Sequence, residues 1–236
     1  MLINKKDTKE KRVVTDFRYL NSKIRWINHP FPLLSETIAR IGHSNCTIMS
    51  VIDIKSAFHS LNLSERAQQY AGIASFNGGK HYYYRKCPQG LSVSPGLWQA
   101  KIDEILCEIP ESREFCIAHH DDIIIFSKNK AMHENHVISL FTALIKHGLK
   151  ICPRKCKLFR DKVIYMGHQI FINSIGQVCV QAMNDRCSAI RKIPIPKSPR
   201  EVKRFIGAVN YLSMFLPRLQ EIIKPLHRLT RKGQKG

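Results

Sequence analysis

The hydrophobic pattern is most informative over residues 115–126, where two short apolar runs flank a polar group of four residues. Apolar, β-favouring runs separated by a short polar stretch predict a tight hairpin. Asp121 and Asp122 lie at its tip, and another apolar run, residues 47–52, ends directly before Asp53. If this run forms a neighbouring strand of the same sheet, three carboxylates converge at one place.

Further hairpins and amphipathic helices are predicted on both sides of this hairpin. A strong turn signal, Asn77-Gly78-Gly79, joins two β-like runs at residues 70–76 and 80–86, and another hairpin is expected over residues 163–180. Helices are expected at residues 35–42, 94–109, 132–147, 198–217 and 218–231. Hairpins interleaved with helices indicate an α+β fold, in which helices cover one face of an antiparallel sheet.

The charge balance indicates a polyphosphate partner. The chain carries 38 Lys and Arg residues against 18 Asp and Glu, which gives a formal net charge of +20 over 236 residues. These basic residues are spread along the chain, and a nucleic acid explains that distribution best, because its backbone rewards distributed cations by releasing counterions. The alternatives are a soluble basic protein without such a partner and an anionic lipid surface, which the sequence favours less because it contains no amphipathic basic helix.

A cluster of three carboxylates repels itself unless divalent cations neutralise it, and Mg²⁺ is the usual partner of carboxylates and substrate phosphates. The pattern therefore outlines a two-metal site for phosphoryl transfer. Zinc is a competing interpretation, based on the pairs His133-x-x-His136 and Cys152-x-x-x-Cys156. Neither pair matches a common zinc-finger spacing. The apolar spacing of the helix at residues 132–147 predicts that both histidines lie on its surface.

The eight cysteines show no spacing typical of a disulfide framework. The sequence also contains no predicted signal peptide, so we expect reduced thiols in an intracellular compartment. The expected location is the cytoplasm, within a virus-like particle, or the nucleus.

Seven motifs occur in a fixed order along the chain. They are Arg12-Val-Val-Thr-Asp-Phe-Arg-Tyr-Leu-Asn21, Val51-Ile-Asp-Ile-Lys-Ser-Ala-Phe58, Cys87-Pro-Gln-Gly90 with Ser94-Pro95, Asp121-Asp122 with Ile-Ile-Ile-Phe-Ser-Lys128, Gly148-Leu-Lys150 with Lys155-Cys156, Tyr165-Met-Gly167, and Phe205-Ile-Gly207 with Asn210-Tyr211. In this order the chain resembles the reverse transcriptases of Ty3/gypsy-type LTR retrotransposons and, more distantly, those of retroviruses. The resemblance covers essentially the whole sequence.

The resemblance implies a right-hand polymerase with an antiparallel palm sheet backed by helices, partial fingers and a small helical thumb. Residues 1–178 would form fingers and palm, and residues 179–236 the thumb and the start of the connection. The implied activity is RNA-directed DNA polymerisation on a template-primer with dNTPs. An upstream fingers segment and ribonuclease H and integrase regions are expected elsewhere in a parent Pol polyprotein.

The resemblance also implies roles for individual residues. Asp53, Asp121 and Asp122 would be the catalytic carboxylates. Mg²⁺, or Mn²⁺ as a substitute, would be bound by Asp53, Asp121 and the backbone carbonyl of Ile54. The residues implied to bind the nucleotide are Lys5, Arg12, Ala57, Phe58 and Gln89. Those implied to bind primer or template are His119, Met166 and Gly167.

His119 departs from the family, which has a Tyr two positions before the first Asp of the pair. Strand alternation predicts that His119 lies on the same side as Asp121 and that His120 points the other way. We expect the nearby carboxylates to favour the protonated form of His119. Two alternatives to an active polymerase stay open. One is a catalytically impaired fragment that only binds nucleic acid, and the other is a zinc-stabilised interaction protein.

Overall fold

The computed structural model describes residues 2–4, 11–25, 27, 29–74 and 79–230, and side chains of residues 2–4 and 11–13 are not considered. The chain forms two compact units, Met1–Val163 and Ile164–Gly236. The sequence placed the change from fingers and palm to thumb at residue 178, and this assignment stays a prediction. None of the described helices is long and apolar enough to cross a membrane.

The first unit is built on a four-stranded antiparallel sheet with strand order β6-β7-β3-β8. Its strands are β3 (Ile48–Asp53), β6 (Cys116–His119), β7 (Asp122–Ser127) and β8 (Lys157–Arg160). The predicted hairpin is thus β6–β7, and the apolar run before Asp53 is the strand that pairs with β7. The two strands are therefore neighbours in one sheet, which was the condition for the three carboxylates to converge.

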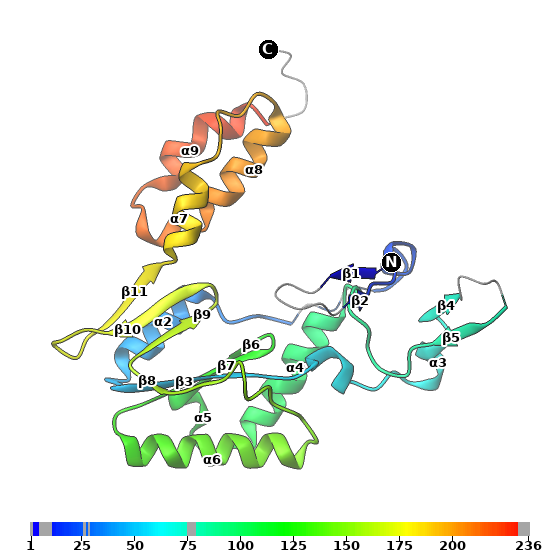
Figure 1. Cartoon of the computed structure of the whole chain (residues 1–236), viewed down its shortest axis with the longest axis horizontal. Helices are drawn as coiled ribbons and strands as arrows, with labels where there is room; N and C mark the ends of the chain where they lie inside the picture. The colour runs from blue at the N-terminus through cyan, green and yellow to red at the C-terminus, as the bar shows by residue number, and fades with distance from the viewer. Residues whose placement is uncertain (1, 5–10, 26, 28, 75–78, 231–236) are drawn as a thin grey trace. The chain divides into compact units, whose positions relative to one another are not determined.

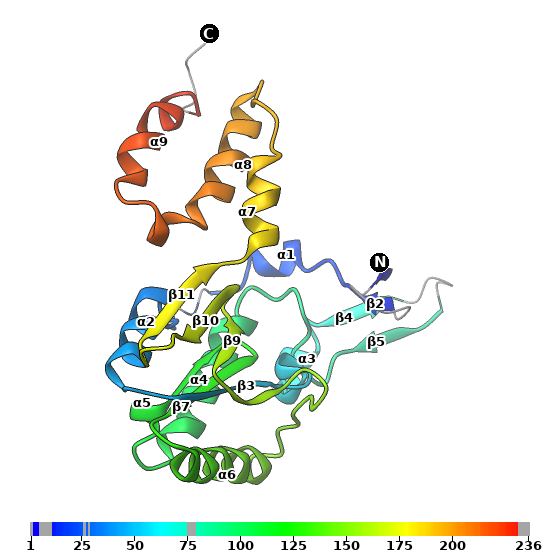
Figure 2. The same cartoon turned by 60° about the vertical axis from the view of Figure 1, so that its left-hand side comes forward.

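Helices α4 (Ser94–Cys107), α5 (Ser112–Phe115) and α6 (Lys130–Lys146) cover one face of this sheet (Figures 1 and 2). The long helices α4 and α6 match the predictions to within two residues at every end, because their apolar positions recur at the helical period. Their buried side chains form one core with the facing side chains of the sheet, among them Ile52, Ala118 and Ile123.

The other elements of the first unit are short. They are β1 (Leu2–Asn4), β2 (Lys11–Val13), α1 (Arg18–Asn21), α2 (Leu34–His43), η1 (Ala57–Ser60), α3 (Glu65–Gln68), β4 (Gly72–Ala74) and β5 (His81–Tyr83). Helix α2 is the helix predicted at residues 35–42. Strands β4 and β5 lie in the hairpin predicted at residues 70–86, and residues 77–78 of its predicted turn lie outside the described residues.

The second unit combines a small sheet with helices. Its strand order is β11-β10-β9, with β9 (Lys162–Tyr165) starting at the end of the first unit. The remaining elements are β10 (His168–Ile172), β11 (Val178–Ala182), α7 (Asn184–Arg191), α8 (Pro199–Asn210), η2 (Ser213–Phe215) and α9 (Leu219–Arg228).

Helix α8 begins as its sequence predicts. The Ser198 hydroxyl oxygen accepts a hydrogen bond of 3.3 Å from the Glu201 backbone N–H, and Pro199 occupies the first turn. The helix ends at Asn210, earlier than the predicted residue 217. Leu219 and Ile223 of α9 pack against Val202 and Ile206 of α8, so the chain reverses direction to bury this apolar stripe.

Candidate active site

The strand register brings acidic side chains together at one end of the central sheet. Asp53 is the partner of Asp122 in the β3–β7 pair, and Asp122 is the partner of His119 in the β6–β7 pair. Directly opposed residues in antiparallel strands point to the same face. Since the adjacent residues Ile52 and Ile123 face the helices, these three side chains lie on the opposite face of the sheet.

Asp121 lies in the turn between the two strands of the hairpin, and its side chain is exposed. Its backbone carbonyl accepts a hydrogen bond of 2.8 Å from the N–H of Ile54, so the turn is tied to the end of β3. The residue before it, His120, has φ +55°, a left-handed conformation that costs a non-glycine residue about 1–3 kcal/mol. We call residues 119–122 the Asp121 turn.

The predicted orientation of His120 is wrong, because strand alternation does not extend into the turn. Strand β6 ends at His119 and β7 begins at Asp122, so His119 shares a face with Asp122 through the register. The imidazole of His120 does not point away from that of His119, since their ring centroids lie 4.5 Å apart. Both rings also lie against the ring of Phe31, whose centroid is 6.0 Å from that of His119 and 4.7 Å from that of His120.

The pKa of His119 is also shifted against expectation. Burial, followed by repulsion from His120, lowers the pKa of this imidazole, and the attraction of Asp121 is a smaller effect in the opposite direction. The nearby carboxylates therefore do not make the protonated form the favoured one. A neutral imidazole can act as a metal ligand, which a protonated one cannot.

Lys155 is the cationic partner of the carboxylate cluster. Its ammonium group donates a hydrogen bond of 2.8 Å to Oδ2 of Asp53, whose side chain is only 11% exposed. The loop that carries Lys155 is fixed by backbone hydrogen bonds, of which one joins the N–H of Cys152 to the carbonyl of Asp53 at 2.9 Å. The hydrogen bond to Asp53 raises the pKa of Lys155. The sequence motif contained this lysine without indicating a role for it.

The electrostatics of the cluster favour a bound cation. Burial and, after it, the neighbouring carboxylates Asp121 and Asp53 together raise the pKa of Asp122 to about 6, against the opposing effect of Lys155. One lysine therefore does not neutralise the three carboxylates. A strongly shifted carboxyl group with charged neighbours is typical of a functional site.

The donor set fits a hard divalent cation, because carboxylate and carbonyl oxygens are the ligands that Mg²⁺ prefers. Among the described residues, however, no three His, Cys, Asp or Glu side chains are already grouped so that they could hold a metal ion. The ammonium group of Lys155 occupies one oxygen of Asp53. A metal ion bound through this oxygen would have to displace it.

The histidine pair that suggested zinc has other partners. His133 is fully buried, so its predicted surface position is wrong. Its Nε2 lies 2.6 Å from the Ser50 hydroxyl and its Nδ1 2.8 Å from the Ser127 hydroxyl, which also contacts Nδ1 of His136 at 2.8 Å. These hydrogen bonds compensate for burial of the polar ring. Burial lowers the pKa of His133 to about 4.

Two residues of α4 that the sequence analysis missed hold the backbone of the Asp121 turn. The indole Nε1 of Trp98 donates to the carbonyl of His120 at 2.6 Å, and the N–H of His120 donates to Oε1 of Gln99 at 3.1 Å. The amide nitrogen of Gln99 donates to the carbonyl of Ala118 at 3.0 Å. The available signal was a Gln placed three and seven residues before Ile102 and Leu106 of the predicted apolar stripe.

The other predicted nucleotide-binding residues are only partly described. Phe58 lies in η1 and packs, half-buried, against the core of the first unit, and Ala57 beside it is buried. Gln89 is half-buried directly before Gly90, whose φ of +102° suits glycine. Lys5 lies outside the described residues, and only the backbone of Arg12 is described, in β2.

Met166 and Gly167 form the two-residue turn between β9 and β10 in the second unit. Both have positive φ, +48° and +75°, as a two-residue hairpin turn of this kind requires. The carbonyl of Gly167 accepts a hydrogen bond of 2.7 Å from the hydroxyl of Tyr211, which also accepts from the N–H of Met183 at 3.1 Å. Tyr211 thus connects this turn to the helices of its own unit.

A comparison with protein families identifies the chain. The family model described as reverse transcriptase (RNA-dependent DNA polymerase) matches residues 3–170. The chain belongs to the reverse transcriptase family. The predicted family and the predicted enzyme class, a nucleotidyltransferase, are thereby confirmed. Members of this family use divalent metal ions, which agrees with an acidic cluster at the end of the sheet.

Relatives with curated descriptions are retrotransposon polyproteins. The Retrovirus-related Pol polyprotein from transposon gypsy of Drosophila melanogaster is 29% identical over 226 residues, which cover 96% of this chain and 21% of that protein. The Transposon Tf2-7 polyprotein of Schizosaccharomyces pombe is 30% identical over 221 residues, covering 94% of this chain and 16% of the relative. The chain thus spans about a fifth of the length of these relatives or less.

Solved structures confirm the fold. The foamy viral protease-reverse transcriptase in complex with an RNA/DNA hybrid matches with a TM-score of 0.76 and 23% identity, over 99% of this chain and 30% of that one. Its form in complex with double-stranded DNA matches with a TM-score of 0.79 and 22% identity, over 100% and 39% of the two chains. The predicted α+β polymerase fold with antiparallel sheets is therefore confirmed.

Proposed function

We propose that this chain is the polymerase part of a retrotransposon Pol protein and extends a primer 3′-hydroxyl with dNTPs on an RNA template. The observation that carries the proposal is the register of β3 and β7, which sets Asp53 beside Asp122, with Asp121 in the adjoining turn. This arrangement occurs in a chain of the reverse transcriptase family.

Asp53, Asp121 and the carbonyl of Ile54 would hold Mg²⁺, with Mn²⁺ as a substitute, and Asp122 would support the cluster. When bound, two such ions activate the attacking oxygen and stabilise the leaving pyrophosphate. Hydrogen bonds hold the backbone of the Asp121 turn beside β3, and Lys155 holds one oxygen of the buried Asp53. The carboxylates would complete the metal site once Lys155 has left this oxygen.

Other residues would bind the nucleotide and the template-primer. Lys5 and Arg12 would bind the triphosphate, because cationic side chains pair with phosphate oxygens. Ala57 and Phe58 would lie against the sugar, and Gln89 would line the pocket beside the template. His119, together with Met166 and Gly167, would contact the primer.

The basic surface and the relatives support a nucleic acid partner. A net charge of +20 favours a polyphosphate duplex, and the foamy viral enzyme has been solved with an RNA/DNA hybrid and with double-stranded DNA. We further propose that ribonuclease H and integrase regions accompany this chain in a parent polyprotein, and that it acts inside the cell, in a cytoplasmic virus-like particle or the nucleus.

Primer extension on an RNA template with Mg²⁺ or Mn²⁺ tests the proposal. We expect extension by the unaltered chain, and its loss in Asp53→Asn and Asp121→Asn with template-primer affinity largely retained, because phosphate contacts come from Lys and Arg. The matched control is Asp161→Asn, which removes an exposed carboxylate between β8 and β9. Strong extension by either active-site variant would contradict the assignment.

The second candidate function is binding of nucleic acid without turnover. The observation that favours it is His119, which replaces the family's Tyr beside Asp122. In that case the chain would bind the template-primer with a steep salt dependence, but would not extend the primer with either Mg²⁺ or Mn²⁺.

A further inference from the structure

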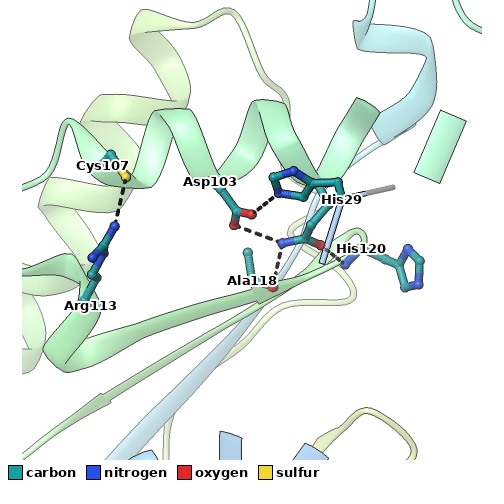
Figure 3. A network of polar contacts seen from close by, with 7 residues as sticks. His29, Asp103, Cys107, Arg113, Ala118 and His120 are labelled. Atoms are coloured by element: carbon teal, nitrogen blue, oxygen red, sulfur yellow. Dashed lines mark hydrogen bonds and ion pairs between the residues drawn. The ribbon is translucent and has the colours of Figure 1, made fainter. Parts of the chain in front are cut away.

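The segment from His29 to Phe31 contacts both the Asp121 turn and the helix that holds it. The Nε2 of His29 lies 2.8 Å from Oδ2 of Asp103 on α4, and the ring of Phe31 lies 4.7 Å from that of His120. Figure 3 shows His29 and Asp103 turned toward each other, close to Ala118 and His120 of the hairpin. The segment is separated from Asp103 by more than seventy residues of sequence.

Asp103 is one of three groups that fix which way the Gln99 amide points, and it is the only one of the three that is a side chain. The amide nitrogen of Gln99 donates to Oδ1 of Asp103 at 3.0 Å and to the carbonyl of Ala118 at 3.0 Å, while its oxygen accepts from the N–H of His120. A carboxylate only accepts hydrogen bonds. In the flipped amide, its oxygen would face the Asp103 carboxylate and its nitrogen would face the N–H of His120. All three hydrogen bonds would be lost.

The Asp121 turn depends on this orientation. His120 has φ +55°, and both of its backbone polar groups are hydrogen-bonded to α4, the N–H to Gln99 and the carbonyl to Trp98. A strained backbone persists only where its surroundings hold it. Loss of the Gln99 oxygen as an acceptor would release one of these two bonds, directly before Asp121.

Gly96 allows the segment to approach the helix. A Cβ at this position would lie 3.2 Å from the carbonyl oxygen of Ile27 and 3.8 Å from Cβ of His29. Gly96, Gln99 and Asp103 occupy positions i, i+3 and i+7 and therefore share one face of α4. The lack of a side chain at Gly96 thus leaves room for His29 to lie within hydrogen-bonding distance of Asp103.

We propose that Asp103, held by His29, is a positioning residue for the reaction: it fixes the Gln99 amide and thereby the backbone of the turn that carries Asp121. The effect of Asp103 on the reaction rate rests on the proposed function, whereas its effect on the backbone of the Asp121 turn does not depend on that function. His29 donates through Nε2–H to one oxygen of Asp103, which leaves the other oxygen directed at Gln99.

Amide hydrogen exchange of the His120 N–H tests the effect on the turn without reference to activity. Asp103→Ala is expected to speed this exchange roughly fivefold to tenfold, because the acceptor is no longer held in place. Asp103→Asn should recover most of the protection, since its amide oxygen can accept from Gln99 and its nitrogen can donate to a neutral His29. His29→Ala should have a smaller effect in the same direction.

The control is Glu104→Ala, which removes the adjacent carboxylate of α4, an exposed group paired with Lys101 at 3.0 Å. It should leave the exchange of His120 unchanged. Unaltered exchange in both Asp103→Ala and His29→Ala would overturn the proposal. Because Asp103 and His29 lie at the surface, with side chains 41% and 28% exposed, we expect both variants to fold.

Primer extension then tests the effect on catalysis. Asp103→Ala should lower kcat roughly tenfold with little change in the KM for template-primer, because a misplaced Asp121 affects the chemical step rather than binding. Glu104→Ala should change neither. An unaltered kcat in Asp103→Ala would overturn the catalytic part. If the unaltered chain does not extend primers, the proposed function fails, and the exchange experiment still decides the positioning role.

Discussion

Lys155 donates a hydrogen bond of 2.8 Å from its ammonium group to Oδ2 of Asp53, so one oxygen of this carboxylate is held by a cation of the chain itself. The lysine side chain is 65% exposed, whereas that of Asp53 is 11% exposed. Asp53 is therefore held in place by its surroundings, whereas the Lys155 side chain has room to move into solvent. A divalent cation bound through this oxygen would therefore compete with Lys155.

The first prediction concerns this competition. Lys155→Met should lower the Mg²⁺ concentration that gives half of the maximal thermal stabilisation, roughly fivefold, because an exposed ion pair contributes about 1 kcal/mol. The measurement is the melting temperature as a function of Mg²⁺ concentration, without nucleic acid. Lys130→Met, which removes an exposed lysine paired with Glu134 on α6, is the control and should have no effect. An unchanged or higher Mg²⁺ requirement in Lys155→Met would refute the competition.

The second prediction concerns sugar selection by Phe58. Phe58→Val should increase incorporation of ribonucleotides relative to deoxyribonucleotides, roughly tenfold or more, if the ring excludes one hydroxyl sterically. The measurement is the ratio of kcat/KM for dNTP and rNTP. Phe141→Val shortens another half-buried Phe that packs on the same core and should leave the ratio unchanged. Equal ratios for both variants would mean that Phe58 serves only the packing.

The third prediction concerns His119, which shares a face with Asp53 and Asp122. Burial lowers the pKa of this imidazole, so it is available as a neutral ligand for zinc. We expect weak activity with Mg²⁺, a relative gain with Mn²⁺, and inhibition by Zn²⁺. His119→Tyr should raise the Mg²⁺-dependent rate several-fold and remove most of the Zn²⁺ inhibition.

The measurement is primer extension in each metal, with a Zn²⁺ titration. His43→Tyr changes an exposed histidine of α2 and serves as the control, which should keep both the rate and the Zn²⁺ inhibition of the unaltered chain. If His119→Tyr also keeps both, the histidine does not limit this enzyme.

The fourth prediction concerns stability and pH. Burial lowers the pKa of His133 from 6.5 to about 4. Above pH 6.5 the ring is neutral in both states and has no effect. Between pH 6.5 and about 4, the unfolded chain binds a proton that the folded chain does not, so the free energy of unfolding falls, by about 3 kcal/mol in total. Burial lowers the pKa of His136 as well and adds to this trend.

Urea unfolding at several pH values between 4 and 7.5 measures this loss. His133→Gln should flatten the pH dependence, because glutamine does not titrate in this range. His59→Gln, at an exposed position, should leave it unchanged. An equally steep loss of stability in His133→Gln would show that other groups cause it.

Local sequence patterns were enough to predict the central strands and the two long helices of the first unit, in their order. Strands β3 and β7 and helices α4 and α6 follow from local apolar periodicity, which is set by which face of each element is buried. The motif order also led to the reverse transcriptase family. The carboxylates could be named in advance, because Asp53 ends one apolar run and Asp121 and Asp122 lie between two others.

Which polar groups contact one another depends on the tertiary structure. Helical spacing placed His133 on the surface, but hydroxyls from two different strands, Ser50 and Ser127, satisfy its ring inside the core. Strand alternation predicted that His120 points away from His119, but their ring centroids lie 4.5 Å apart because the turn interrupts the alternation. Such partners are distant in sequence, and local patterns contain no information about them.

Large separations in sequence also explain why local patterns did not predict the hydrogen bonds that hold the Asp121 turn and Asp53. His29 and Asp103 are 74 residues apart, and Lys155 and Asp53 are 102 residues apart. Whether two such side chains form a hydrogen bond depends on strand pairing, helix packing and the missing side chain at Gly96. These are properties of the folded chain, because the free energy of each polar contact depends on the burial and geometry of both partners.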